Sequence, residues 1–572
     1  MLNWISSKLK QNRTDHPLGS EAGITEFLDG LTSGRPESNL LELVEWLGDP
    51  EKLTPELPPE YAIRAIMRLD EAGAAAVAVT WQQFLSQERV DHYAEQKLKS
   101  LDTYYQAVRL SYWHCLNLLT SNPGAAGSNL GGAIALLAQR SIAALSGRLR
   151  IMHIRYRTPD AAWWDAVGAA LQSAQAAGVI NLKQRTYPED PTPSSPWLEY
   201  LINLFFEVAP LGNLVPQQMD LLFRLLRWLE PHFMVQDSFS TQSAHCIRLD
   251  KPAPPVKVTE ALPADPNLVY FGPGLAYGQL IRLRSTLKQS GELPDWMTIS
   301  QCPFDKTLAV IDALVMHWSE RPPERRFVRK RKEAKLLVAS GFSQIRRLVA
   351  FSEFARSGRK LGYTTHLEML KFERSGFADA TEESASDEEK WKNATPLQTI
   401  ELLETRGDRQ MMDEWSLKDV SETGLGAIVP FLKPWIVIGA YVGYRLDDKI
   451  DWQIGILRRI HRVDTGHPSV GVESLPELPR CAQILPLDLQ PGADPWVQMN
   501  KEAAGDHVLD AVVLSMSDSR VLIPTAVFTE NRVLALLLSG SRVPVRLKSI
   551  MHQNGDCDCV QYELCEQAPA RR

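Results

Sequence analysis

Two short groups of polar residues in the second half of the chain have the types and spacing of a ligand-binding site. Arg325 and Arg329 form an R-x-x-x-R pair, and Asp419, Ser421 and Gly424 form D-x-S-x-x-G. Arginine binds phosphate oxygens and the O6/N7 edge of guanine, and a carboxylate accepts hydrogen bonds from ring N–H groups. A serine hydroxyl bonds either kind of group, and a glycine permits a positive φ and close backbone approach. None of these roles needs a nucleophile or a general base, so we expect binding without turnover and no catalytic residue.

Three more cations lie beside the arginine pair and could assist or replace it: Arg326, Lys330 and Arg331. A basic cluster is usually a solvated segment, and D-x-S-x-x-G alone is often a plain turn at a strand edge. The order of the two groups and the strand-like runs around them favour a shared site.

Those runs are rich in β-branched and aromatic residues and are punctuated by turn residues, which predicts strands. They cover residues 334–342, 436–446, 452–463 and 470–475. A charged insertion with helical character, at about 348–408, separates the arginine pair from D-x-S-x-x-G. Loop-closure cost grows only logarithmically with length, so a folded insertion is tolerable. It could also cover the site or present a surface to a partner.

Together these features resemble the PilZ domain, the bacterial receptor module for cyclic di-GMP, over residues 321–478 apart from the insertion. The resemblance implies a β-barrel that binds cyclic di-GMP through the R-x-x-x-R arginines and the D-x-S-x-x-G residues. It also implies a bacterial effector that controls motility, pili, biofilm or virulence. The alternative is a PilZ-like scaffold that binds no nucleotide and acts through protein–protein contacts.

The first half of the chain predicts helices. After an N-terminal tail, residues 1–20, apolar residues recur at helical spacing through residues 21–250, as in the run 40–47. Turn residues such as Asn122-Pro123-Gly124 separate the helical stretches. We expect an all-α domain, either a bundle or a short helical array, that recognises an unidentified protein partner. Residues 251–320 predict a proline-rich linker and a mixed helical segment.

Residues 479–572 predict a small second β-domain that packs on the first barrel or completes a larger one. Arg542 and Arg546 repeat the R-x-x-x-R spacing there, but no D-x-S-x-x-G follows, so we interpret them as structural. The fold class is therefore α+β multidomain.

Composition and spacing argue against several other functions. The net charge is −7, which disfavours binding of a nucleic acid polymer. Seven scattered cysteines fit a reducing compartment, so we expect a cytoplasmic protein. Cys557 and Cys559 are the one close pair, but further ligands are lacking, so we predict no metal site and no cofactor. We also expect no transmembrane segment, because no apolar run is long enough.

Two weaker patterns hint at enzyme chemistry. Gly272, Gly274 and Gly278 follow a strand-like run, but Pro273 removes a backbone N–H that a dinucleotide loop would use. His507 and Asp510 lie close together without a nucleophile. We interpret neither group as an active site.

Overall fold

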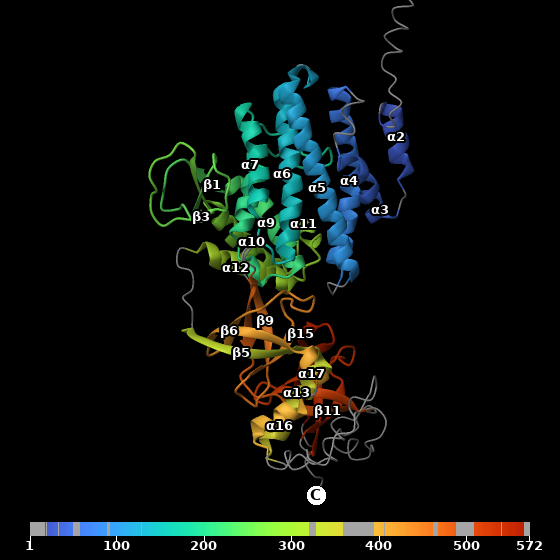
Figure 1. Ribbon diagram of the computed structural model, residues 1–572, viewed down its shortest axis with the longest axis vertical. Coiled ribbons are helices and arrows are strands. Elements are labelled where there is room, and N and C mark those ends of the chain that lie inside the picture. Colours follow the sequence, from blue (N-terminus) through green and yellow to red (C-terminus); the bar gives the residue numbers. More distant parts are fainter. Residues whose placement is uncertain are drawn as a thin grey trace, which may run out of the picture. The chain divides into compact units, whose positions relative to one another are not determined.

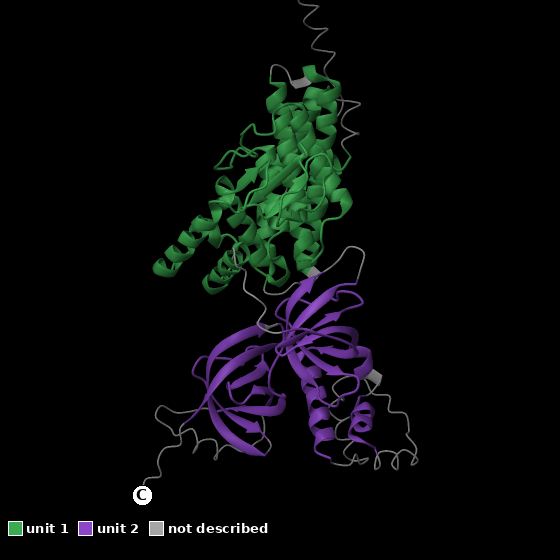
Figure 2. Cartoon of the chain, turned by 90° about the vertical axis from the view of Figure 1, so that its left-hand side faces the viewer, with its two compact units in different colours: residues 1–324 green, residues 325–572 purple. Residues whose placement is uncertain are grey.

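Helices fill the first part of the chain and strands fill the second, so the α+β multidomain prediction is confirmed (Figure 1). The computed structural model describes residues 18, 20–31, 34–49, 58–87, 92–126, 129–319, 328–358, 394–404, 406–461, 467–487, 508–538 and 540–565. The chain divides into two units, residues 1–324 and residues 325–572 (Figure 2).

The helices of the first unit begin where capping residues and prolines occur in the sequence. Ser20, Asp160 and Ser195 each accept a backbone N–H at a helix start, and several helices have proline in their first turn. The helices are α2 Glu21–Gly30, α3 Pro36–Leu47, α4 Pro59–Leu85, α5 His92–Ser121, α6 Leu130–Ile154, α7 Ala161–Ala176, α8 Pro196–Glu207, α9 Pro216–Leu229, α10 Ala276–Ser290, α11 Asp295–Thr298 and α12 Phe304–Trp318. Short 3₁₀ turns occupy Pro123–Ala126, Leu211–Asn213 and Glu230–His232.

Helix α6 lies at the centre of this unit and packs on α5, α7, α8 and α9 (Figure 1). Among the described residues, it is the helix that is long and apolar enough to cross a membrane, but 67% of that stretch is buried inside the unit. Such burial is typical of a core helix. We therefore assign its apolar character to the protein core.

Buried polar residues tie the long helices together. Asp70 of α4 accepts hydrogen bonds from Tyr104 (2.9 Å) and Tyr112 (2.6 Å), both on α5. Asp220 of α9 accepts from Trp81 Nε1 at 2.7 Å and from Ser300 Oγ at 2.7 Å. All of these hydrogen-bond partners belong to helices or loops of the same unit. The two clusters therefore link its helices to one another.

The structure of the first unit differs from the sequence-based expectations in three respects. Leu18 is fully buried, so the core begins before residue 21. The region up to residue 250 is not all-α, because a four-stranded sheet has the order β1-β4-β2-β3. Its strands are β1 Met234–Gln236, β2 His245–Arg248, β3 Val256–Lys257 and β4 Leu268–Gly272. Strands this short leave almost no period-two pattern. Helices α10 and α12, predicted within a linker region, contribute Leu280 and Ile311 to the same core.

The second unit begins with a closed six-stranded barrel, consistent with the fold that the resemblance implies. Its cyclic strand order is β10-β7-β6-β5-β8-β9. The strands are β5 Lys330–Ser340, β6 Asp413–Ser421, β7 Gly424–Ile428, β8 Tyr441–Leu446, β9 Gln453–His461 and β10 Ser469–Ser474. In β6, buried Trp415 and Leu417 alternate with exposed neighbours, so this strand has one face inside the barrel and one outside.

Residues 480–564 form a second closed barrel of its own, with the order β11-β12-β13-β16-β15-β14. Its strands are β11 Arg480–Pro486, β12 Leu509–Ser515, β13 Arg520–Pro524, β14 Val533–Leu538, β15 Ser541–Asn554 and β16 Cys557–Leu564. If the strands of each barrel are numbered along the chain, both barrels have the cyclic order 1-2-3-6-5-4. The second barrel therefore repeats the topology of the first.

The described part of the insertion is helical and starts earlier than expected, with α13 Phe342–Arg356 directly after β5. It ends with α16 Pro396–Leu403 and α17 Arg406–Met411. Helices α13 and α16 share an apolar cluster with the outer faces of both barrels, including Trp452 and Leu514. The insertion thus helps to hold the two barrels together.

Candidate ligand-binding site

The site forms because β5 and β6 are antiparallel, so the start of β5 lies beside the end of β6. Arg331 is paired with Asp419 in the strand register. Arg329, just before β5, places its Nη1 atom 3.0 Å from Asp419 Oδ1 and 3.3 Å from Oδ2. One residue of R-x-x-x-R and one of D-x-S-x-x-G are therefore in direct contact, although 90 positions separate them.

This ion pair is partly exposed, although Asp419 Oδ1 itself is buried. The Arg329 side chain is 34% exposed and that of Asp419 is 19% exposed. Surface ion pairs of this kind contribute only about 0–1 kcal/mol, since water competes for both partners. Exchanging the pair for contacts with a ligand therefore costs little free energy.

Ser421 and Gly424 close the hairpin between β6 and β7. They are paired in register, and Ser421 Oγ donates a hydrogen bond to the Gly424 carbonyl oxygen at 3.1 Å. The expected positive φ at Gly424 is wrong, since this residue begins β7 as ordinary strand. The expected close approach is present, because a Cβ there would lie 2.3 Å from the Val472 carbonyl oxygen. Glycine is needed so that β10 can pack against β7.

The remaining predicted cations differ in position. Arg325 and Arg326 lie outside the described residues. Arg331 is exposed and points to the same face as Asp419, because paired residues of an antiparallel ladder share a face. Lys330 is paired with Val420 and points to the other face. Of the auxiliary residues that the structure describes, Arg331 fits the site better.

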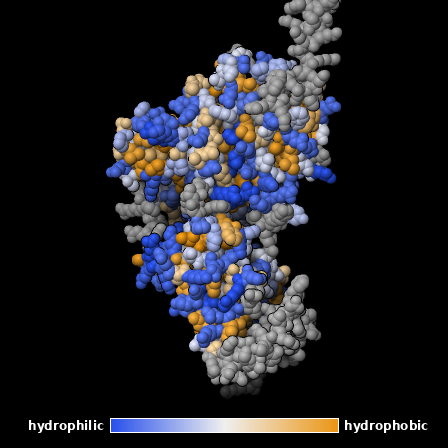
Figure 3. Space-filling view, viewed as in Figure 1, coloured by the Kyte–Doolittle hydropathy of each residue, from blue (hydrophilic) through white to orange (hydrophobic). Residues whose placement is uncertain are grey.

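The surface at this end of the barrel is hydrophilic, as Figure 3 shows where β5 begins. Exposed charged residues there include Lys332, Lys418 and Glu422. Opposite charges are interspersed, so the local field is less basic than the arginine cluster alone suggests. Recognition of an anion there depends on particular arginine forks more than on overall charge.

Two glycines that were not predicted as site residues also belong to this face, Gly426 and Gly471. They are paired with each other between β7 and β10, and each lies between buried apolar residues of its strand. They therefore face outward beside Asp419, whose carboxylate lies over Gly426. Glycine inside a strand is itself a signal of close approach by a ligand or by backbone. The alternation Gly424-Leu425-Gly426 carries that signal.

The described helices of the insertion begin at the opposite end of β5 from the candidate site. The site forms at the start of the strand, whereas α13 begins after its last residue, Ser340. An 11-residue strand is about 33 Å long. The described helices of the insertion therefore replace a hairpin loop at the far end and do not interrupt the pairing that forms the site.

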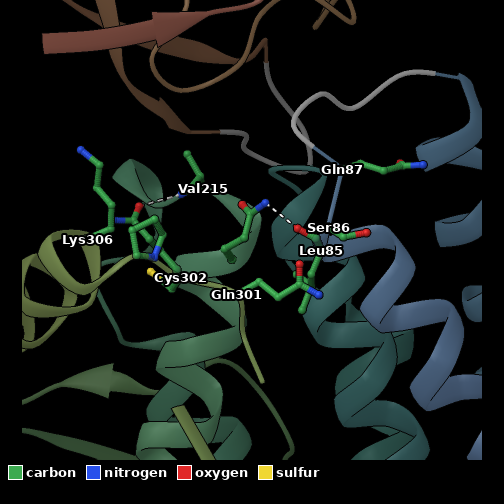
Figure 4. A pocket seen from close by; sticks show the side chains of 10 residues that line it. Leu85, Ser86, Gln87, Val215, Gln301, Cys302 and Lys306 are labelled. Carbon is green, nitrogen blue, oxygen red and sulfur yellow. Dashed lines mark hydrogen bonds between the residues drawn. The ribbon is translucent and has the colours of Figure 1, made fainter. Parts of the chain in front are cut away.

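A second candidate is a hollow in the helical unit, where the end of α4 meets the starts of α9 and α12 (Figure 4). Its volume is about 250 Å³, and Gln217, Gln301, Cys302 and Lys306 are among the residues that line it. This is below the range usual for ligand pockets. Burial raises the pKa of the Cys302 thiol to about 11, so it is protonated at neutral pH and is a poor nucleophile. The hollow offers no evident reaction chemistry.

The described residues of the other patterns noted in the sequence are buried in a core or paired with a neighbouring side chain. Cys557 and Cys559 are buried, burial raises the pKa of both thiols, and no metal-binding group occurs among the described residues. Asp510 forms an ion pair with Arg346 of α13 at 2.8 Å, and His507 lies outside the described residues. Arg546 pairs with Glu563 at 3.5 Å on the second barrel.

Residues 22–240 match a protein-family model described as the N-terminal domain of the cyclic-di-GMP receptor FimW. The match covers most of the helical unit and ends before the barrels. No curated protein matches the chain. The matched model describes a domain of a receptor for the same dinucleotide that the barrel residues indicate, and the two indications come from different parts of the chain.

Proposed function

We propose that this chain is a cyclic di-GMP receptor that binds the dinucleotide on the outer face of the first barrel, without turnover. The contact between Arg329 and Asp419 is the observation that carries the proposal, since it unites the two groups of binding residues. The family match of residues 22–240 to a cyclic-di-GMP receptor domain supports the same ligand independently.

Each residue has a role that follows from its chemistry. Arg329 and Arg325 bind the phosphates, which suit the planar guanidinium fork. Asp419 accepts hydrogen bonds from guanine N1–H and N2–H₂. Ser421 donates its hydroxyl proton within the hairpin, so it offers the ligand its oxygen lone pairs. None of these groups acts as a nucleophile or as a general base.

Binding affects the point where the two units join in sequence. The division falls between Glu324 and Arg325, directly at the R-x-x-x-R segment. When Arg329 exchanges Asp419 for a phosphate, the segment gains contacts that exist only in the bound state. A ligand shifts an equilibrium only through such differential contacts. We propose that the signal passes to a cytoplasmic protein partner of the helical unit, with an output in motility, pili, biofilm or virulence.

The test is isothermal titration calorimetry of the full chain with cyclic di-GMP. We expect the wild type to bind, and both Asp419→Ala and the double variant Arg325→Ala/Arg329→Ala to lose at least about tenfold in affinity, because each removes charge-assisted hydrogen bonds. Lys335→Ala is the matched control, since this exposed cation of β5 pairs with Glu414 at 2.7 Å, away from the site. If a folded wild type does not bind, the scaffold alternative replaces this proposal.

A further inference from the structure

A continuous row of residues crosses four strands on the outer face of the first barrel. Asp419 on β6 is paired with Gly426 on β7, Gly426 with Gly471 on β10, and Gly471 with Arg459 on β9. Paired residues of antiparallel strands point to the same face. The row therefore has a charged residue at each end and a floor of two glycines between them.

Both charged side chains lean over this floor. A Cβ at Gly426 would lie 2.8 Å from Asp419 Oδ1, so the carboxylate extends over that glycine. A Cβ at Gly471 would lie 3.4 Å from the Cβ of Arg459 and 4.0 Å from its Nε. The acid and the arginine thus approach the floor from opposite sides, and any side chain at position 426 would displace the acid.

The width of the floor suits a purine ring. Asp419 and Arg459 are separated by three strand spacings of about 4.8 Å, or about 14 Å. A hydrogen bond of about 2.9 Å at each edge of the ligand takes up about 6 Å of this span. The remaining distance suits one planar base and the short reach of an aspartate. Gly471 presents bare backbone, whereas Gly426 is buried under the Asp419 carboxylate, so a flat ring can lie close to the floor beside that carboxylate.

We infer that Arg459 is a base-reading residue that binds the O6/N7 edge of one guanine while Asp419 binds its N1–H and N2–H₂ groups. This inference rests on the proposed function and adds a residue outside both sequence groups. Arginine binds the two acceptors of guanine in a bidentate manner. Adenine has an amino donor in place of O6, so Arg459 disfavours cyclic di-AMP. Arg329 then binds the phosphates.

Arg458, the preceding residue, does not fit this role. A register shift in β9 leaves it without a partner on β10. Arg459 has the register position opposite the floor. The distinction between these adjacent arginines depends on strand register and not on their spacing from D-x-S-x-x-G.

The test is calorimetric titration of the full chain with cyclic di-GMP and with cyclic di-AMP. We expect Arg459→Ala to weaken cyclic di-GMP binding by about 10- to 100-fold, as when a hydrogen bond to a charged group is lost. We expect Arg459→Lys, which keeps the charge but lacks the fork, to reduce the preference for guanine. Gly471→Val fills the floor without removing a charge and should also weaken binding. Lys335→Ala should bind as the wild type does.

The outcomes separate the inference from the proposed function. If Arg459→Ala binds with wild-type affinity and selectivity while Asp419→Ala does not bind, the role of Arg459 is overturned and the receptor function stands. If the wild type itself does not bind, the proposed function fails and the inference fails with it. Thermal unfolding of each variant checks that the exposed substitutions leave the fold intact.

Discussion

At the scale of single residues, the D-x-S-x-x-G sequence builds the barrel at the point where we propose that the ligand binds. Ser421 closes the hairpin, and Gly424 allows β7 and β10 to approach. The close approach expected at Gly424 is present, whereas the positive φ expected there is wrong. The role that we propose for Arg459 was not predictable, because it depends on a register across four strands that only tertiary pairing defines.

The close approach at Gly424 predicts a large effect of adding one methyl group. In Gly424→Ala, the new Cβ would meet the backbone oxygen of Val472 at 2.3 Å, and backbone cannot rotate away. We expect a loss of about 1–3 kcal/mol in the free energy of unfolding, measured with urea. Gly471→Ala is the control, since its Cβ would make only ordinary contact at 3.4 Å. Equal stability of the two variants would contradict this account.

At the scale of elements, the insertion is anchored to the first barrel by a buried ion pair. Glu404, at the end of α16, binds Arg445 of β8 with both carboxylate oxygens at 2.8 Å, and Trp452 Nε1 donates to it at 3.1 Å. The two charged side chains are 1% and 2% exposed. This pair was not predictable from the sequence, because its members are 41 positions apart.

Removing one partner of this pair should destabilise the second unit strongly. We expect Glu404→Ala to lower the free energy of unfolding by about 3–5 kcal/mol, because Arg445 would be left buried and uncompensated. Replacing both residues together, as Glu404→Leu/Arg445→Met, should restore part of the loss. Urea unfolding followed by tryptophan fluorescence measures both variants. A double variant less stable than Glu404→Ala would count against the explanation.

The second barrel repeats the first in topology but holds a carboxylate at the corresponding hairpin. Glu477, just before β11, accepts hydrogen bonds from Ser515 Oγ at 2.6 Å and from the Met516 N–H at 2.9 Å, and it also accepts from Ser517 Oγ. In the first barrel, Arg329 occupies the comparable place before the first strand. The charge is thus reversed, which argues for a structural role of this second hairpin.

The contacts of Glu477 predict a dependence of stability on pH. Hydrogen bonds from Ser515 and Ser517 lower the pKa of this carboxyl from 4.5 to about 2. A lowered folded-state pKa means that the stabilisation is complete above about pH 4.5 and is lost as the pH falls toward 2. In acid titration followed by circular dichroism, Glu477→Gln should lack the loss of stability that occurs between about pH 4.5 and 2. An unchanged acid transition in the variant would refute the assignment.

At the scale of the whole molecule, the order of helical and strand regions was predictable from the period of apolar residues. The four-stranded sheet in the helical unit was not, since β1 to β4 have at most five residues each. Nor was the assignment of α10 and α12 to the helical core, because a proline-rich stretch before them suggests a linker. Local composition indicates where the chain is extended but does not indicate which core a later helix joins.

Separate cores in the two units predict two unfolding transitions in scanning calorimetry of the full chain. Cyclic di-GMP should raise only the transition that Glu404→Ala lowers, because a ligand stabilises the unit that binds it. At a ligand concentration of 100 times Kd the gain is about 2.7 kcal/mol. A shift confined to the other transition would place the ligand in the helical unit.

A crystal structure of the full chain with cyclic di-GMP would show whether the dinucleotide binds on the outer face of the first barrel. We expect electron density for a guanine over Gly426 and Gly471, between Asp419 and Arg459, with a phosphate at Arg329. Density in the helical unit or on the second barrel, with an unaltered pair between Arg329 and Asp419, would contradict it.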